Sequence, residues 1–135
     1  SATEARAAAG GGVLAANLLW SGGVKSWMTV VGEASELQIA EPRPRFGIVT
    51  DRVTALSLRL GAFQVRKDKR WVQTELGRPQ EIFRRPIPLE VREVAPNRWY
   101  LTPKAPLKPG EYCFAGVLNG PVADFTITVE PDKGR

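Results

Sequence analysis

The segment from Arg66 to Arg85 carries the side chains whose chemistry is most visible in this sequence. It holds seven lysines and arginines against three acidic residues, and this excess supplies most of the formal net charge of +5. Trp71 and Phe83 lie among these charges. Such a set can follow a phosphate backbone while rings stack on bases, and it equally suits lipopolysaccharide, an acidic glycan or an acidic protein surface. The candidate residues for an anionic ligand or partner are Arg66, Lys67, Lys69, Arg70, Trp71, Arg84 and Arg85.

The same segment also fits a solvated hairpin tip whose two aromatic side chains point into the core. Both interpretations stay open, because sequence does not show which side chains are exposed. No recognisable nucleic-acid module accompanies the charges. Nucleic acid therefore ranks below acidic proteins and envelope components as a partner.

This chain offers few side chains for catalysis, because it contains no histidine. The absence of histidine removes Ser-His and Cys-His nucleophile pairs, histidine general bases and most zinc or copper sites. Neither a glycine-rich phosphate loop nor a dinucleotide fingerprint is present. We therefore expect no enzyme, no cofactor and no metal. A carboxylate pair for glycoside hydrolysis, drawn from Glu33, Glu36, Glu41 and Asp51, is the lowest-ranked alternative.

The single cysteine, Cys113, has no second cysteine in the chain with which to form a disulfide. A catalytic thiolate would need a base, and no histidine can supply one. We expect Cys113 to be a small buried apolar side chain. A disulfide between two chains is the alternative.

Short alternating segments separated by glycines and prolines predict an all-β chain. The closing segment alternates clearly: Phe125, Ile127 and Val129 are expected to point into the core, and Asp124, Thr126 and Thr128 outward. Residues 111–118 are apolar at both parities, which predicts a central strand covered on both faces. Strands are expected over residues 24–31, 36–39, 46–50, 55–66, 70–76, 87–92, 99–102, 111–118 and 124–129.

The strand expected over residues 55–66 changes phase along its length. Leu56, Leu58 and Leu60 share one face, whereas Phe63 and Val65 have the other parity. One extra residue would restore the phase, so the sequence predicts a β-bulge or a sharp bend at residues 61–62. Residues 66–69 then form the tip of a hairpin.

The segment LKPGEY places Leu107, Gly110 and Tyr112 in a Leu-x-x-Gly-x-Tyr turn. This turn resembles the tyrosine corner of immunoglobulin-like sandwich domains. The resemblance implies an immunoglobulin-like two-sheet antiparallel sandwich of about 7–9 strands, with Gly110 and Tyr112 in structural roles. It also implies that the Tyr112 hydroxyl donates to a backbone group a few residues upstream.

The segment departs from antibody-type domains, in which a disulfide cysteine follows the tyrosine by two residues. Here Cys113 follows it by one and lies on the opposite face of the strand. The turn is also similar to that of small bacterial periplasmic sandwich domains, including those of copper-resistance proteins. Those domains bind copper through histidines, so the resemblance implies the fold and an exported bacterial protein without the copper site.

The domain organisation expected is a flexible arm rich in alanine and glycine over residues 1–12, followed by one β-sandwich domain over residues 13–135. No apolar run is long enough to span a bilayer as a helix. Residues 13–20 form an apolar segment of strand length. It can pair within its own domain or be donated to a sheet edge of another subunit.

These observations favour a non-enzymatic protein-interaction or structural assembly module located outside the cytoplasm, in the periplasm, on the cell surface or secreted. It would act through a protein partner or by self-association. The alternative is a binding domain for an anionic polymer through the basic region 66–85. That polymer would be a nucleic acid, lipopolysaccharide or an acidic glycan.

Overall fold

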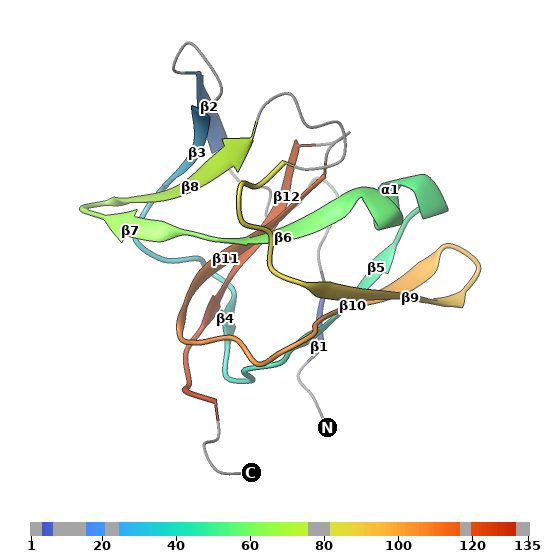
Figure 1. Ribbon diagram of the computed structural model, residues 1–135. Helices are drawn as coiled ribbons and strands as arrows, with labels where there is room; N and C mark the ends of the chain where they lie inside the picture. The colour runs from blue at the N-terminus through green and yellow to red at the C-terminus, as the bar shows by residue number, and fades with distance from the viewer. Residues whose placement is uncertain (1–3, 7–15, 21–24, 76–81, 117–119, 132–135) are drawn as a thin grey trace.

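The computed structural model describes residues 4–6, 16–20, 25–75, 82–116 and 120–131 (Figure 1). Within these residues the fold is all-β, with twelve strands and one short helix, α1 (Arg52–Ser57). The strands form three four-stranded sheets. Sheet A has the order β1 (Glu4–Arg6), β5 (Arg45–Val49), β10 (Arg98–Pro103), β9 (Leu89–Ala95). Sheet B has the order β2 (Ala16–Trp20), β3 (Lys25–Val31), β8 (Lys69–Glu75), β7 (Gln64–Arg66). Sheet C has the order β4 (Gln38–Ile39), β12 (Gly120–Ile127), β11 (Gly110–Gly116), β6 (Leu58–Ala62).

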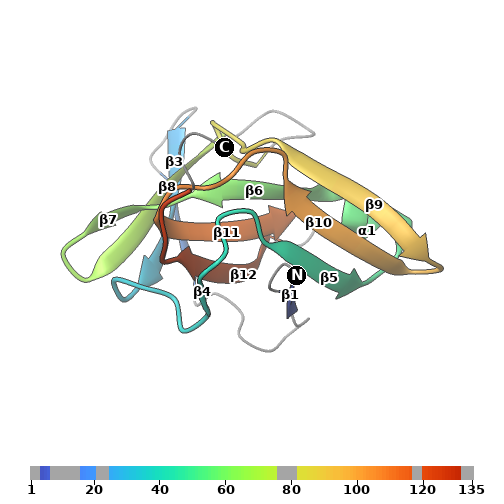
Figure 2. The same ribbon diagram turned by 90° about the horizontal axis from the view of Figure 1, so that it is seen from below.

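Sheet C lies between the other two sheets. Figure 2 shows β7 and β8 on one side of β6, β11 and β12, and β5, β9 and β10 on the other. The larger core cluster joins sheet A to sheet C, with Phe46 and Leu101 packing against Phe114 and Phe125. A smaller cluster joins sheet B to the other face of sheet C. The structure thus has more strands and one more sheet than the two-sheet, 7–9-strand arrangement that the sequence predicts.

Strand β11 is buried on both faces, as its sequence predicts. Tyr112 and Phe114 point toward sheet A, whereas Cys113 and Ala115 belong to the cluster under sheet B. The aromatic rings give the larger cluster its shape, with the centroids of Phe46 and Phe114 4.8 Å apart in an edge-on arrangement. Aromatic rings packed in this way stabilise the fold by more than the burial of their apolar area alone. This central strand therefore holds both cores in place.

The outward face expected for β12 is covered. Phe125 and Ile127 are buried in the larger cluster as predicted, but Thr126 is also buried and Asp124 is only partly exposed. Sheet B and the loop after β3 lie over this face. The prediction that Asp124 and Thr126 both point to solvent is therefore wrong, because an alternating pattern of polar residues does not show whether they face water or a second sheet. Beyond the end of β12, Thr128 is exposed as predicted, whereas Val129 is exposed and its predicted place in the core is wrong.

The strand expected over residues 55–66 is divided into three pieces. The first residues of this segment, up to Ser57, belong to α1. The helix forms here because Asp51 caps it and accepts a hydrogen bond from the Thr54 backbone N–H at 2.8 Å. Pairing of β6 with β11 is regular through residues 61–62, so no bulge lies there. The break comes at Phe63, where the chain leaves sheet C and enters sheet B as β7. A change of sheet, rather than a bulge, accounts for the change of phase.

Two N-terminal segments pair within the chain. β1 lies parallel to β5, so residues 4–6 form a strand where the sequence predicts a flexible arm, since the edge of β5 offers unpaired backbone groups. The remainder of that arm lies outside the described residues. β2 lies antiparallel to β3 of the same chain. The described part of the apolar segment 13–20 therefore occupies the edge of its own sheet B.

The LKPGEY turn closes the sandwich as expected. The Tyr112 hydroxyl donates to the backbone oxygen of Lys108 at 2.6 Å, which confirms the predicted contact to an upstream backbone group. Gly110 begins β11 and pairs with Ile127. Leu107 is buried in the larger cluster, and its backbone N–H donates to the Pro42 oxygen at 2.7 Å. The turn is thus attached to both sheets of that core.

Candidate functional site

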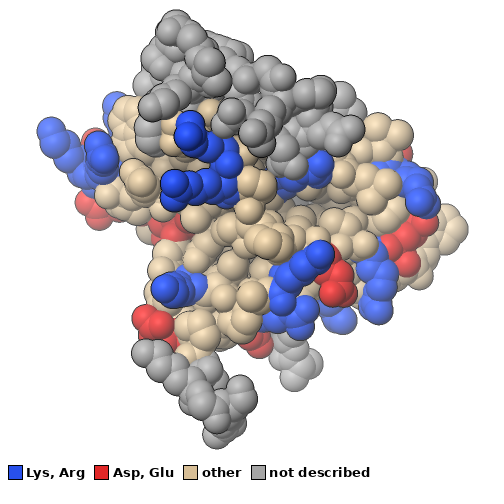
Figure 3. Space-filling model, in the orientation of Figure 1, with Lys and Arg blue, Asp and Glu red and all other residues tan. Residues whose placement is uncertain are grey.

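The basic region lies on the β7–β8 hairpin and on the segment that follows β8. Lys67 sits at the hairpin tip with a φ of +56°, and Arg66 pairs with Lys69 across it. The tip predicted at residues 66–69 is therefore confirmed. Figure 3 shows basic side chains over the part of the surface that the β7–β8 hairpin occupies. In the part of the region that the structure describes, the exposed basic residues are Arg66, Lys67, Lys69, Arg84 and Arg85; Arg78 lies outside the described residues.

Strand β8 divides its residues between two environments. Arg70, Val72 and Thr74 are buried toward sheet C. Lys69 is exposed, and Trp71 and Gln73 are partly exposed, on the opposite face. Arg70 is 3% exposed, so its assignment to an external anion-binding surface is wrong. Strand alternation decides this, because neighbouring residues point to opposite faces.

The two aromatic side chains of the basic region separate in the same way. Phe83 is buried in the smaller core cluster, and its ring packs against Gly61. A Cβ at Gly61 would lie 2.8 Å from the Phe83 ring, so only glycine permits this approach. Trp71 remains partly exposed. Of the two aromatics, Trp71 is the one available to a ligand.

Two hollows lie on either side of Trp71. The first is about 550 Å³, and the second is about 390 Å³. Gln64 and Trp71 line both. Among described residues, the first hollow is also lined by Arg66, Lys67, Asp68 and Lys69. The second is also lined by Ala62, Phe63, Val72, Gln73, Arg84 and Arg85. Volumes of this size are typical of ligand pockets.

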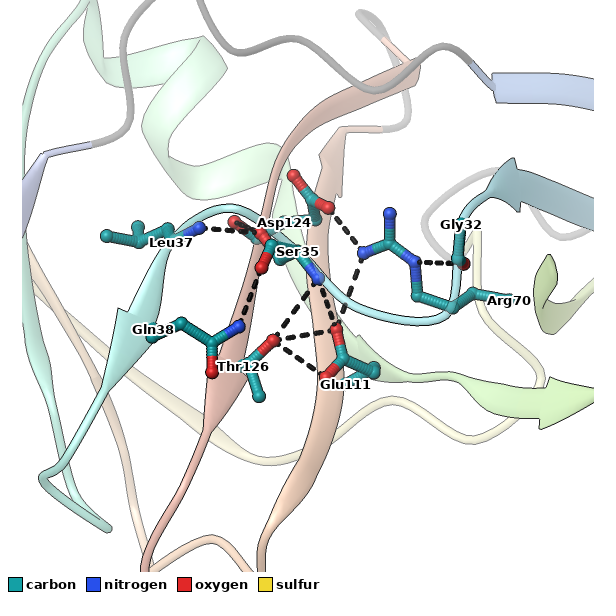
Figure 4. Close-up of polar contacts among 8 residues, drawn as sticks. All are labelled: Gly32, Ser35, Leu37, Gln38, Arg70, Glu111, Asp124 and Thr126. Atoms are coloured by element: carbon teal, nitrogen blue, oxygen red, sulfur yellow. Dashed lines mark hydrogen bonds and ion pairs between the residues drawn. The ribbon is translucent and has the colours of Figure 1, made fainter. Parts of the chain in front are cut away.

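Arg70 instead binds two carboxylates on the face of sheet C (Figure 4). Its Nη1 donates to Asp124 Oδ2 at 2.5 Å and lies 3.5 Å from Glu111 Oε1. Its Nε donates to the Gly32 backbone oxygen at 3.1 Å. The side chains of Arg70 and Glu111 are 4% and 7% exposed. The guanidinium therefore joins sheet B to sheet C through bonds that water barely reaches.

The Glu111 carboxylate is also held by uncharged donors. The Ser35 backbone N–H donates to it at 2.7 Å, and the Thr126 hydroxyl lies within 2.8 Å of both its oxygens. The Ser35 hydroxyl donates to the Asp124 backbone oxygen at 3.2 Å. These contacts attach the loop between β3 and β4 to the face of sheet C. The Arg70 guanidinium and the uncharged donors together compensate the buried carboxylates, so this network has a structural role.

Sequence reasoning did not single out Glu111 or Asp124 as partners of Arg70. One signal could have found Glu111: it begins a strand whose sequence predicts burial on both faces. A buried carboxylate needs a cation or several hydrogen-bond donors. The identity of the cation was not accessible, because Arg70 is 41 residues away in sequence.

Cys113 lies beside this network and is fully buried. Burial raises the pKa of the Cys113 thiol well above its ordinary value, the Asp124 charge raises it further, and the Arg70 charge opposes the change. The thiol is therefore held neutral. The prediction of a small buried side chain is confirmed.

Replacing Arg70 with methionine should lower the free energy of unfolding by about 3–5 kcal/mol, because two carboxylates would then lack their buried cation. Lys69→Met, on the exposed face of the same strand, should change it by less than about 0.5 kcal/mol. Denaturant unfolding of both variants measures the difference. Equal effects would show that the buried ion pairs do not hold the sheets together.

Removing the Cys113 thiol should flatten the dependence of stability on pH. A raised folded-state pKa means that the native protein keeps its thiol proton while the unfolded chain loses it above about pH 8.5. Stability is thus full below that pH and falls as pH rises. We expect the free energy of unfolding of the unmodified protein to fall more steeply between about pH 8.5 and 10 than that of Cys113→Ala. Parallel curves would contradict this.

Among the described residues, no cluster of three or more cysteine, aspartate or glutamate side chains is arranged to hold a metal ion. No helix in the same part of the chain is long and apolar enough to cross a membrane. Comparison of the chain with protein-family models, curated proteins and solved structures found no match.

Proposed function

We propose that this chain is a non-enzymatic interaction module with an immunoglobulin-like sandwich that acts outside the cytoplasm through protein contacts. Strand order supports the sandwich type. Sheet C runs β4-β12-β11-β6 and faces β5-β10-β9. In chain order, β5, β6, β9, β10, β11 and β12 would correspond to strands B to G of that fold, with Tyr112 at the start of F. The location rests on the resemblance of the LKPGEY turn alone.

The observation that carries the interaction function is the open rim between sheets A and C. Strand β9 ends sheet A, so one of its sides offers backbone groups to another strand. An apolar groove of about 390 Å³ runs beside it. Leu56, at the end of α1, is 49% exposed there. The groove is lined by Leu56, Leu58, Arg59, Pro86, Ile87, Pro88, Leu89 and Val91.

The charges on β9 favour a second copy of the chain as the partner. Glu90 and Arg92 are exposed, with Val91 between them on the other face. When two β9 strands pair antiparallel about a two-fold axis at Val91, Glu90 of each copy lies opposite Arg92 of the other. Opposite charges in such pairs stabilise a sheet, and like charges destabilise it. The charges would thus select this register rather than prevent pairing.

The test is the mass of the protein in solution over a range of concentrations. Arg92→Glu should weaken self-association, because glutamates would then face each other across the axis. Glu90→Arg combined with Arg92→Glu should restore it. Lys67→Glu, an equal change of charge at the tip of the β7–β8 hairpin in sheet B, should have no effect. A protein that remains monomeric at every concentration, or a double variant no better than the single one, would contradict the proposal.

A second candidate function, binding of an anionic polymer, is favoured by the exposed cations beside Trp71. With Arg70 and Phe83 buried, five basic side chains in the described part of this region are exposed. They border both hollows, so cations lie on each side of a partly exposed ring. Attraction of this kind weakens as salt rises, because released counterions contribute much of the affinity.

Binding to heparin and to single-stranded DNA at two salt concentrations tests this second function. Arg66→Glu combined with Arg84→Glu alters one cation of each hollow and should reduce binding strongly. The matched control is Arg98→Glu with Lys104→Glu, which changes the net charge equally at exposed positions elsewhere. Binding that does not respond to salt, or that falls equally in both double variants, would contradict a site at this region.

A further inference from the structure

We propose that the second hollow, lined by Gln64, Trp71, Gln73, Arg84 and Arg85, binds an acidic polysaccharide through the carboxylates of its uronate residues. The inference rests on the second candidate function and names its ligand class. The inference depends on the anchoring of the two arginines, on the side chains that share the Trp71 face, and on the cations that line the first hollow.

The two arginines follow a firmly attached residue. Phe83 is 1% exposed and pairs with Thr74 in an isolated β-bridge. The Arg84 backbone N–H donates to the Gln73 oxygen at 3.1 Å. The segment thus continues the hairpin side of β8 beyond the end of β7. Exposed guanidinium groups start from a backbone that is fixed beside Trp71, which reduces the cost of ordering them around a ligand.

The side chains beside Trp71 suit a sugar ring. Gln64 pairs in register with Trp71, and Gln73 follows Trp71 by two residues, so both lie on the same face of sheet B as the indole. An indole face packs against the apolar face of a pyranose, and amide groups both donate to and accept from hydroxyls. Arg84 and Arg85 can each bind a carboxylate through two parallel N–H groups. Together these groups can recognise the hydroxyls and carboxylate of one uronate ring and the carboxylate of a neighbouring one.

A nucleic acid fits the same face less well. Single strands bind through successive aromatic side chains on which successive bases stack. Among the described residues that line the two hollows, Phe63 is buried and its ring lies 5.5 Å from the Arg70 guanidinium carbon, which leaves Trp71 as the ring at the surface. One ring with two amides favours a sugar over a run of bases.

The first hollow extends the site along a polymer. Lys67 and Lys69 lie on the other side of Trp71 from the two arginines, among the residues lining that hollow. Cations on both sides of the ring can meet carboxylates on neighbouring sugars of one chain. A polyuronate should therefore bind more tightly than a single uronic acid.

Equilibrium binding to polygalacturonate, dextran and oligothymidylate tests the inference. We expect polygalacturonate to bind most tightly and neutral dextran not to bind. Trp71→Ala should weaken polygalacturonate binding about tenfold, equivalent to about 1.4 kcal/mol, whereas Trp71→Phe should retain most of it. Thermal unfolding of both variants separates loss of the ring from loss of the fold.

A double variant that keeps both positive charges distinguishes specific recognition of carboxylates from attraction by charge alone. Arg84→Lys with Arg85→Lys keeps both charges but removes the paired N–H groups, so polygalacturonate binding should fall while the salt dependence stays the same. Arg98→Lys is the matched control. Equal binding of all polyanions, unaffected by the lysine variant, would overturn the uronate inference and leave anionic-polymer binding standing. Tighter binding of oligothymidylate would assign the site to nucleic acid, and no binding of any polyanion would overturn both.

Discussion

The contact between Arg70 and the carboxylates of Glu111 and Asp124 is the constraint on which the three-layer arrangement depends. Among the side chains that the structure describes, strands β3 and β8 place Val30 and Val72 in the smaller core cluster, which also includes alanine and cysteine from β11. The buried guanidinium adds to this packing by bonding to strands β11 and β12 and to the loop after β3. Buried ion pairs of this kind are sensitive to the loss of one partner, so they also select one packing of the sheets.

The same strand that supplies this buried cation also supplies the exposed face. Because β8 alternates, Arg70 can join the sheets only if Lys69 and Trp71 point away from them. The segment carrying Arg84 and Arg85 is attached beside this face by Phe83, which fills the space left by Gly61. Core packing thus positions the surface that the proposed ligand would meet. The rim at β9 depends on the other core, between sheets A and C.

Much of the fold could be predicted from local pattern. Alternation located most strands, and the doubly apolar segment identified β11 as central. The resemblance of the LKPGEY turn to a tyrosine corner implied a bond from the Tyr112 hydroxyl to an upstream backbone group, which the structure identifies as the Lys108 oxygen. The basic region was found because its charges are contiguous in sequence. Alternation failed at residues 55–63, where a capped helix and a change of sheet replace one strand. It also failed at Thr126, because a polar residue can face a buried partner as well as water.

The sequence by itself determined the all-β class, the lack of histidine chemistry, and the lack of a second cysteine with which Cys113 could form a disulfide within the chain. These follow from composition and from the two-residue period of a strand, which are local properties. Only the tertiary structure decided that Arg70 is buried while Arg66 and Lys69 are exposed, and that Glu111 and Asp124 meet it. Those outcomes depend on a third sheet covering sheet C. The contacts that place this sheet join residues far apart in the chain, and no local pattern specifies them.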